Sequence, residues 1–472
     1  MDNFWDSNVW GFLNVLAVLL LSLLVANVLR KSIKWLRDSL IPISVIGGAI
    51  LVLVAAVYKW ITDDILFDTA FFAGKGTAYL ELLTYHCLAL GFIASSLKTS
   101  EAKMTKQRTT EIFNTGVTTV ATYLLQAVVG FGITILTALF VIPGFFEAAG
   151  VLLPFGYGQG TGQAMNYGSI YELDWGFVGG KSFGLTIAAM GFISAALGGV
   201  FHLAVLKRKG KVKLIRGEDE KITLEDVQGK NEIPMQESVD KLTVQVALIA
   251  VSYMVAFFMM FGLGNLLPGM KSVIYGFNFL LGVLAATLVK LTFNLLKKWG
   301  AVKREYTNNF LLTRTSNFFF DLMVVAGVAA IRFGDIDKYW GVLLVLGVAG
   351  VIITYAYNHY VAKKLFPAYA EQQFLMMYGM LTGTASTGVI LLREIDGDFK
   401  TPAADNMVYQ NFPAIVFGFP LMLLATLAPE KPYLTFGILL AFFLVMNIIL
   451  FRSKIFRRKK KVEKETVTAA KE

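Results

Sequence analysis

The sequence is poor in charge and in cysteine. Only 16% of its 472 residues are charged, whereas a soluble protein carries about a quarter charged residues. The single cysteine, Cys87, excludes an internal disulfide. The low charge argues against a soluble protein of this size.

Several catalytic patterns are also missing. The three histidines, His86, His202 and His359, are scattered, and the chain has neither an H-E-x-x-H motif nor paired aspartates on one helix face. The string "GFVGGKS" at 176–182 lacks the first glycine of a phosphate loop, because Trp175 holds that place. These absences argue against a membrane-embedded enzyme and an ATP-driven pump, so we expect neither enzymatic activity nor an organic cofactor.

Long apolar runs dominate the chain instead. Hydrophobic residues make up 56% of it, and a run of 18 or more such residues is typical of a transmembrane helix. We therefore predict an all-α membrane protein with eleven spanning helices. The predicted runs are 9–29, 41–60, 77–98, 113–142, 177–206, 241–265, 271–297, 308–332, 339–362, 404–428 and 433–451.

The charges between the runs predict an orientation. The first ten residues, "MDNFWDSNVW", contain two acids and no Lys or Arg, unlike the basic start of a signal peptide. The first run is followed by Arg30, Lys31, Lys34 and Arg37, so the positive-inside rule places that end in the cytoplasm and the N-terminus outside. The last run leads into "RSKIFRRKKKVEK", which we expect to lie in the cytoplasm and to touch the anionic lipid of the bilayer rather than nucleic acid.

One long polar segment divides the chain. Residues 207–240 mix both signs of charge, which favours a solvated cytoplasmic linker. This linker separates an N-terminal half, 1–206, from a second half, 241–429. Residues 430–472 then supply an extra transmembrane helix and a basic tail.

Two glycine-rich strings interrupt the apolar pattern, "PFGYGQGTGQAMNYGSI" at 154–170 and "MYGMLTGTASTG" at 377–388. They share the pattern Y-G-x-x-T-G-x-A, and each lies between the fourth and fifth spanning runs of its half. Five crossings, an odd number, separate the two copies, so the copies have opposite orientations. This is the arrangement of inverted-topology transporter repeats, and we predict re-entrant or broken-helix hairpins over 148–171 and 370–395.

The residue types in these strings suit ion and anion binding. Glycine permits sharp turns and close backbone approach. The N-terminus of a broken helix suits a carboxylate, and its freed carbonyl groups can bind sodium. The alternative is that the small residues only allow helices to pack closely. The candidate binding residues are Gly158, Gln159, Gly160, Thr161, Gly162, Gln163, Asn166, Gly379, Thr382, Gly383, Thr384, Ser386 and Thr387.

Asp321 is a further candidate, because an ionisable group in the middle of a spanning run is costly and often functional. It could bind sodium or carry a proton, or it could pair with Arg314. The candidate sodium ligands are thus Thr161, Asp321 and Thr382.

Over nearly its whole length, the chain resembles the bacterial sodium/glutamate symporters. The resemblance rests on "IPISVIGGAILVLV" at 41–54, "LALGFIASSLK" at 88–98, "GQGTGQA" at 158–164, "SFGLTIAAMGFISAALGG" at 182–199 and "LTGTAST" at 381–387. It implies two inverted halves of five helices, each with a glycine-rich re-entrant segment, and the run 433–451 is an extra helix beyond that plan.

The resemblance also implies a function. It implies a homodimer in the bacterial inner membrane that imports glutamate, or a related small carboxylate, together with sodium by an elevator-type mechanism. Similar members usually carry a histidine where this chain has Gln159. The residues by themselves leave open a proton-coupled carrier or a channel for another small organic anion.

Overall fold

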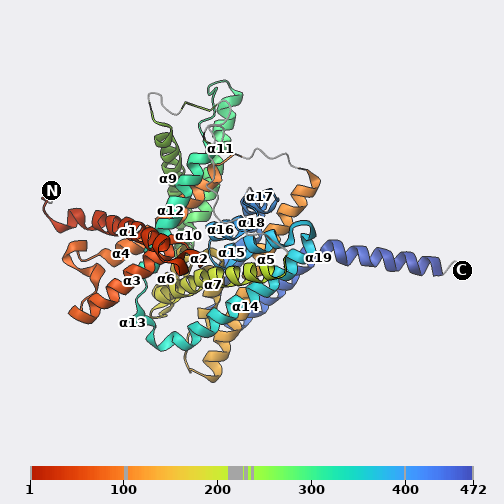
Figure 1. Cartoon of the computed structure of the whole chain (residues 1–472), viewed down its shortest axis with the longest axis horizontal. Coiled ribbons are helices and arrows are strands. Elements are labelled where there is room, and N and C mark those ends of the chain that lie inside the picture. The colour runs from red at the N-terminus through yellow and green to blue at the C-terminus, as the bar shows by residue number, and fades with distance from the viewer. Residues whose placement is uncertain are drawn as a thin grey trace.

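The computed structural model describes residues 3–99, 105–210, 227, 232–234, 239–397 and 400–469. It describes only the backbone of residues 269, 273, 386, 412 and 456–469. Every element within these ranges is a helix, and the predicted linker 207–240 falls mostly outside them. The helices form one bundle from which α19 extends toward the C-terminus (Figure 1).

Ten helices in the described part of the chain are long and apolar enough to cross a membrane. They lie in α1 (Ser7–Ser32), α3 (Ile43–Thr62), α4 (Gly76–Leu97), α5 (Lys106–Phe140), α7 (Gly180–Arg208), α9 (Lys241–Leu266), α11 (Asn278–Lys298), α12 (Asn309–Ala329), α14 (Trp340–Leu365) and α19 (Pro432–Ala469). The prediction of an all-α, multi-pass membrane protein is confirmed.

The predicted run 404–428 is not straight. It consists of α17 (Ala403–Tyr409) and α18 (Asn411–Leu427), which are bent by 54° where they meet. The described part of the chain therefore holds ten spanning candidates, or eleven if this bent pair counts as one span.

Shorter elements fill the connections and the interior. They are α2 (Lys34–Asp38), η1 (Leu66–Asp68), η2 (Ala70–Phe72), η3 (Glu147–Val151), η4 (Pro154–Gly158), α6 (Thr161–Trp175), η5 (Pro268–Met270), α10 (Lys271–Gly276), α13 (Phe333–Ile336), η6 (Asp337–Tyr339), η7 (Pro367–Tyr369), α15 (Ala370–Thr382) and α16 (Ala385–Arg393).

Local sequence accounts for where several long helices begin. A side-chain oxygen accepts a hydrogen bond from a free backbone N–H of the first turn at Asp6 before α1, Asp240 before α9 and Asn308 before α12. Such caps stabilise helix ends whose N–H groups have no partner within the helix. At the other end of α1, Arg30 and Lys31 lie in the last turn, where they complement the negative end of the helix dipole.

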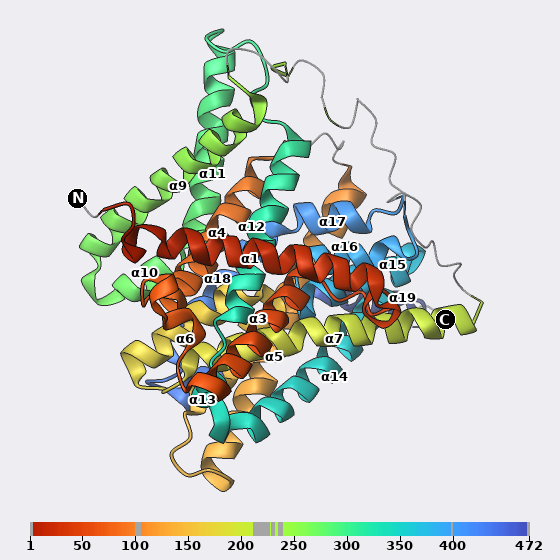
Figure 2. The same ribbon diagram turned by 60° about the vertical axis from the view of Figure 1, so that its left-hand side comes forward.

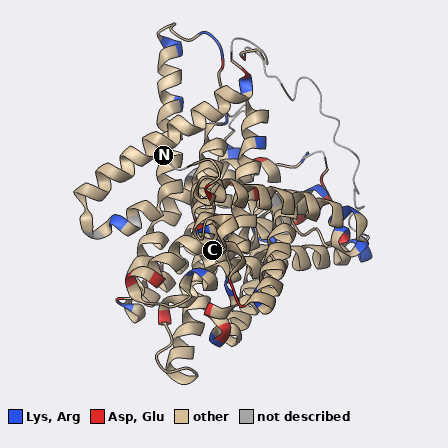
Figure 3. Ribbon diagram, turned by 90° about the vertical axis from the view of Figure 1, so that its left-hand side faces the viewer, with Lys and Arg blue, Asp and Glu red and all other residues tan. Residues whose placement is uncertain are grey.

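Apolar side chains cover the outside of the bundle as well as its core. Figure 3 shows long helical stretches without charge, with most charged residues near helix ends and in connections. Large apolar side chains are exposed on the outer helices, among them Leu24, Phe258, Leu344 and Ile448. A surface of this kind suits contact with lipid and not with water.

The helices form two groups around the interior. Helix α12 packs on both α3 and α4, and α5 packs on α14, α18 and α19. Helices α9 and α11 lie side by side at one edge (Figure 2). The short elements η4, α6, α15 and α16 lie between these groups and contact α7.

Close contact between glycines on α5 and η3 holds the start of the first glycine-rich segment. A Cβ atom on Gly130 would lie 2.3 Å from the carbonyl oxygen of Gly150, but one on Gly132 would meet its nearest neighbour, Phe436, only at 3.5 Å. We expect Gly130→Ala to lower the free energy of unfolding by about 1–3 kcal/mol through overpacking. Thermal unfolding of the purified protein in detergent measures this.

Gly132→Ala is the matched control, because it lies on the same helix and has room for a methyl group. It should leave stability unchanged or raise it slightly, since alanine favours helix over glycine by up to about 1 kcal/mol. Equal loss in both variants would contradict a specific contact between α5 and η3.

Candidate functional site

The first glycine-rich segment is a helix interrupted once and folded back on itself. Element η4 ends at Gly158 and α6 begins at Thr161. Between them, Gly160 has φ +82°, a conformation that side-chain-bearing residues rarely adopt. The rings of Phe155 and Tyr167 stack with centroids 3.9 Å apart and hold the two arms together. The turn thus depends on glycine, and the arms depend on aromatic packing.

The second segment has the same general form. Helix α15 ends at Thr382 and α16 begins at Ala385. The hydroxyl of Thr384 caps α16 by accepting a hydrogen bond from the backbone N–H of Thr387 at 3.3 Å. The arms touch backbone to backbone, since a Cβ atom on Gly379 would lie only 2.7 Å from the Cα atom of Gly388. These glycines are needed for the close approach of α15 and α16.

The two interruptions meet in the interior of the bundle. A Cβ atom on Gly160 would lie 3.9 Å from the carbonyl oxygen of Gly383 and 4.0 Å from the ring of Phe192 on α7. Helix α7 approaches both segments, because a Cβ atom on Gly191 would lie 2.5 Å from the carbonyl oxygen of Thr382 and 3.3 Å from Tyr157. Segments distant in the sequence are thus brought to one place.

The shared pattern is only partly equivalent in the structure. Its first residues, Tyr157 and Tyr378, are both fully buried and both reach Ser194: the Tyr157 hydroxyl lies 3.0 Å from Ser194 Oγ, and that of Tyr378 donates to the Ser194 carbonyl at 2.9 Å. The matched threonines differ, since Thr161 begins α6 after its interruption and Thr382 ends α15 before its own. Sequence matching therefore locates both segments but does not align their turns.

The candidate hydroxyl groups are mostly engaged with backbone. Thr161 donates to the carbonyl of Met323 at 3.3 Å and Thr382 donates to the carbonyl of Tyr378 at 2.6 Å, and both threonines are fully buried. The remaining candidates at the interruptions are buried, apart from the half-buried Gln159 and Thr384. The side chain of Ser386 lies outside the described part of the chain.

The amides of α6 connect the first segment to another helix break. Asn166 donates to the carbonyl of Gly276 and to Gln163 Oε1, the latter at 3.2 Å. Gly276 ends α10, so the predicted continuous run 271–297 is in fact two helices, α10 and α11. The Tyr85 hydroxyl donates to the preceding carbonyl, that of Tyr275, at 2.7 Å, so side chains from α4 and α6 both bind backbone at this break.

Two buried polar atoms near the interruptions have no hydrogen-bond partner among the described residues. One is Nε2 of Gln163, a donor, and the other is Oε1 of Gln126 on α5, an acceptor. Buried polar atoms are normally paired with protein, water or an ion. An unpaired donor and an unpaired acceptor beside the same turns are therefore candidate contacts for a bound anion and a bound cation.

Gln126 was not among the residues selected from the sequence. Its Nε2 atom donates to the carbonyl of Leu381 at 3.0 Å and to Thr354 Oγ1 at 2.9 Å. Its Oε1 atom would lie 3.3 Å from a Cβ atom on Gly158, so one amide contacts both segments. The signal available in the sequence was an amide midway along the apolar run 113–142, where polar groups are costly.

The structure does not bring Asp321 to the interruptions. Its side chain lies close to Ser44 on α3 instead. Met323 lies two residues after Asp321 on α12, which places it about 200° around the helix axis from Asp321. Met323 faces the first segment, and its carbonyl accepts the hydrogen bond from Thr161. Arg314 lies over the ring of Phe310 at 5.1 Å from the ring centre.

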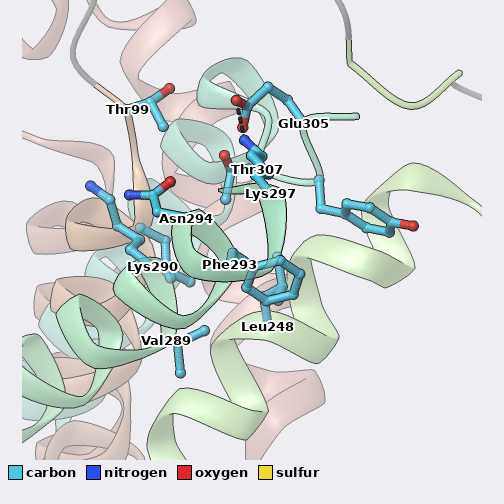
Figure 4. Close-up of a pocket in the computed structure, with 11 residues that line it drawn as sticks. Thr99, Leu248, Val289, Lys290, Phe293, Asn294, Lys297, Glu305 and Thr307 are labelled. Atoms are coloured by element: carbon cyan, nitrogen blue, oxygen red, sulfur yellow. Dashed lines mark ion pairs between the residues drawn. The ribbon is translucent and has the colours of Figure 1, made fainter. Parts of the chain in front are cut away.

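Two hollows lie away from the glycine-rich segments. A small one of about 50 Å³ lies between α9, α11 and the loop before α12, where Lys297 pairs with Glu305 (Figure 4). Lys290 in its wall donates to the carbonyls of Ser96 and Lys98, which satisfies free groups at the end of α4. A larger hollow of about 490 Å³ between α1, α4 and α12 is lined almost wholly by apolar side chains. Among the described residues, neither hollow is lined by a buried polar atom that lacks a hydrogen-bond partner, unlike the interruptions.

No protein-family model matches this chain, and no curated protein sequence matches it. The geometry at the two interruptions is therefore the basis for assigning a function.

The hydroxyl of Tyr157 provides a test of how firmly the first segment is held. It donates to the carbonyl of Gly347 at 2.7 Å as well as meeting Ser194. We expect Tyr157→Phe to lower the free energy of unfolding by about 1–3 kcal/mol, because a buried acceptor loses its partner. Thermal unfolding in detergent measures the change.

Tyr433→Phe is the control, because Tyr433 is 59% exposed and its hydroxyl makes only a 3.4 Å contact with Glu147. It should unfold as the unmodified protein does. If the two phenylalanine variants unfold at the same temperature, the buried bonds of Tyr157 do not secure the segment.

Proposed function

We propose that this chain is a sodium-coupled secondary transporter that imports glutamate or a related small carboxylate. The observation that carries the proposal is the meeting of two interrupted helical segments, at Gly160 and Gly383, inside a bundle of membrane-spanning helices. Non-helical backbone at membrane depth is tolerated only where protein surrounds it or where it lines a cavity. Paired broken helices near the midplane are typical of transporters with internal repeats.

The carboxylate would bind at the start of α6. The N-cap residue of this helix, Gly160, has no side chain, and no described side chain caps its first turn. The first N–H groups, beginning at Thr161, are therefore open to an anion at the positive end of the helix dipole. The unpaired Nε2 donor of Gln163 lies in the same first turn. This set of donors supports an anionic substrate.

Sodium would bind where oxygen atoms gather around the turns. Hard cations prefer oxygen ligands. The unpaired Oε1 of Gln126 lies beside Gly158, and the carbonyl of Gly383 lies beside Gly160. The hydroxyls of Thr161 and Thr382 could rotate from their backbone partners to join them. Asp321 remains a candidate ligand that would require a rearrangement of α12.

The membrane arrangement forms part of the same proposal. The segments 148–171 and 370–395 would be re-entrant hairpins that enter from opposite sides, with the N-terminus outside and the basic tail in the cytoplasm of a bacterial cell. A homodimer would provide a fixed scaffold, and the hairpins with α7 would belong to the part that moves between the two faces. The resemblance of the sequence to the sodium/glutamate symporters supports each of these points.

The direct test is uptake by purified protein in liposomes. With sodium outside and no ATP, we expect saturable accumulation of labelled glutamate or of another member of a panel of small carboxylates. Dissipating the sodium gradient should stop accumulation. Equal uptake in sodium-free buffer under a proton gradient would instead indicate a proton-coupled carrier, and flux that does not saturate would indicate a channel.

Cysteine labelling tests the opposed entry of the two hairpins. In a Cys87→Ser background, we expect Thr161→Cys to react with an impermeant thiol reagent from outside and Thr382→Cys to react from inside. Sodium with substrate should protect both, because both positions would line one site. Labelling is quantified in right-side-out and inverted vesicles.

Two exposed positions calibrate the sidedness of those vesicles. Trp60→Cys, in the last turn of α3, should label from outside, and Trp299→Cys, after α11, should label from inside, since both side chains are largely exposed. Reaction of both threonine positions from the same side would contradict the inverted arrangement.

A further inference from the structure

Three side chains of metal-binding type converge away from the two interruptions. They are His202 on α7, His359 on α14 and Glu371 in the first turn of α15. One ligand atom from each lies within 4.8 Å of the other two. The residues are far apart in the sequence, so only the packing of these three helices brings them together.

His202 is already oriented by a neighbour. Its Nδ1 atom lies 2.7 Å from the hydroxyl of Tyr355, and its Nε2 atom lies 2.9 Å from Glu371 Oε2. Histidine ligands of metals characteristically use one ring nitrogen for the ion and bind an oxygen with the other. If Nδ1–H donates to Tyr355, Nε2 faces the Glu371 carboxylate. A proton between Nε2 and Glu371 Oε2 would account for their hydrogen bond, and a metal ion bound by both atoms would take the place of that proton.

His359 supplies the third group. Its ring lies edge-on to that of His202, with centroids 5.3 Å apart, and its Nδ1 atom is buried without a hydrogen-bond partner among the described residues. A buried polar atom left unpaired calls for a ligand or water. The histidine pair and one carboxylate form a nitrogen and oxygen set that suits zinc and related divalent ions.

We propose that His202, His359 and Glu371 form a binding site for a divalent transition-metal ion of the zinc class. Tetrahedral ligands about 2.0–2.1 Å from zinc stand about 3.3 Å from one another. The most distant pair of ligand atoms would close by about 1.5 Å at most. His202 Nε2 and Glu371 Oε2, which lie 2.9 Å apart, would separate by about 0.4 Å. The fourth position would be left to water. The Glu371 side chain is 22% exposed, which provides a path for the ion.

The surrounding charges set a limit on affinity. Two neutral imidazoles and one carboxylate carry a single negative charge, and Lys209 and Lys363 add opposing positive charge nearby. The ion would also join three helices, since α15 would be tied to α7 and α14 at the start of the second glycine-rich segment. Binding should therefore stabilise the fold measurably without being irreversible.

Zinc titration of the full-length protein, stripped with chelator and free of any histidine tag, tests the site. A competing fluorescent chelator reports affinity, and thermal unfolding reports stabilisation. We expect one ion per chain and a raised melting temperature. His359→Ala and Glu371→Gln should each weaken binding by at least about tenfold and remove the thermal shift. Cobalt should give the visible absorption of a tetrahedral ion in the unmodified protein and in neither of these two variants.

His86→Ala is the matched control, because His86 is the third histidine of the chain and is bound instead to Tyr253 at 2.7 Å. It should bind zinc as the unmodified protein does. Absence of zinc binding, or equal binding by His359→Ala and His86→Ala, would overturn the proposal. Should His359→Ala fail to fold, His202→Asn and Glu371→Gln provide the same comparison. These measurements do not involve transport, so their outcome tests the metal site independently of the proposed function.

Discussion

The architecture depends on one constraint, which is that backbone interrupted inside an apolar bundle must find its hydrogen-bond partners within the protein. Unpaired backbone groups cost several kcal/mol in hydrocarbon surroundings. At the first interruption Tyr123 donates to the carbonyl of Gly158 at 3.1 Å, and at the second Gln126 donates to the carbonyl of Leu381. Both side chains come from α5, so one unbroken helix supplies partners to two broken ones.

Helix α7 provides the other common support. Its small residues Gly191, Ser194 and Gly198 follow the three- and four-residue spacing that places side chains on one helix face. Gly191 admits the backbone of Thr382, Ser194 meets both buried tyrosines, and Gly198 leaves room for the Tyr378 hydroxyl. Since the proposed metal ligand His202 lies farther along α7, this helix links the interruptions to the cluster at the start of α15.

The two interrupted segments could be located from the sequence, but the geometry of their turns could not be predicted from it. Glycine and hydroxyl residues are concentrated at 154–170 and 377–388. These residue types disfavour a continuous helix, so their concentration indicated the two segments in which the helices break. The residue at which each turn occurs could not be predicted from the sequence. Thr161 and Thr382 match in the shared pattern, yet Thr161 follows its turn and Thr382 precedes its turn. A backbone turn is set by the neighbours that satisfy it, and those neighbours come from other helices.

Side-chain roles show the same limit. Asp321 stood out as an ionisable residue within a helix, but which way it faces depends on the rotation of α12, and it contacts Ser44. Asn166 donates to the backbone carbonyl of Gly276 at the end of α10, a contact that depends on how α6 packs against α10. Gln126 was not selected from the sequence, because nothing in its apolar helix indicates that both segments pack against it, as they do in the structure.

The sequence by itself determined that the chain is an all-helical membrane protein with about the observed spans, because length and apolarity are local properties that lipid selects directly. It also marked the two glycine-rich segments in which η4 and α6, and α15 and α16, are separated by a break. Only the tertiary structure decided that the two interruptions touch, that α5 and α7 hold them, and that His202, His359 and Glu371 share one place. These contacts join residues that are distant in the chain, and helix packing, which no local pattern encodes, brings them within reach.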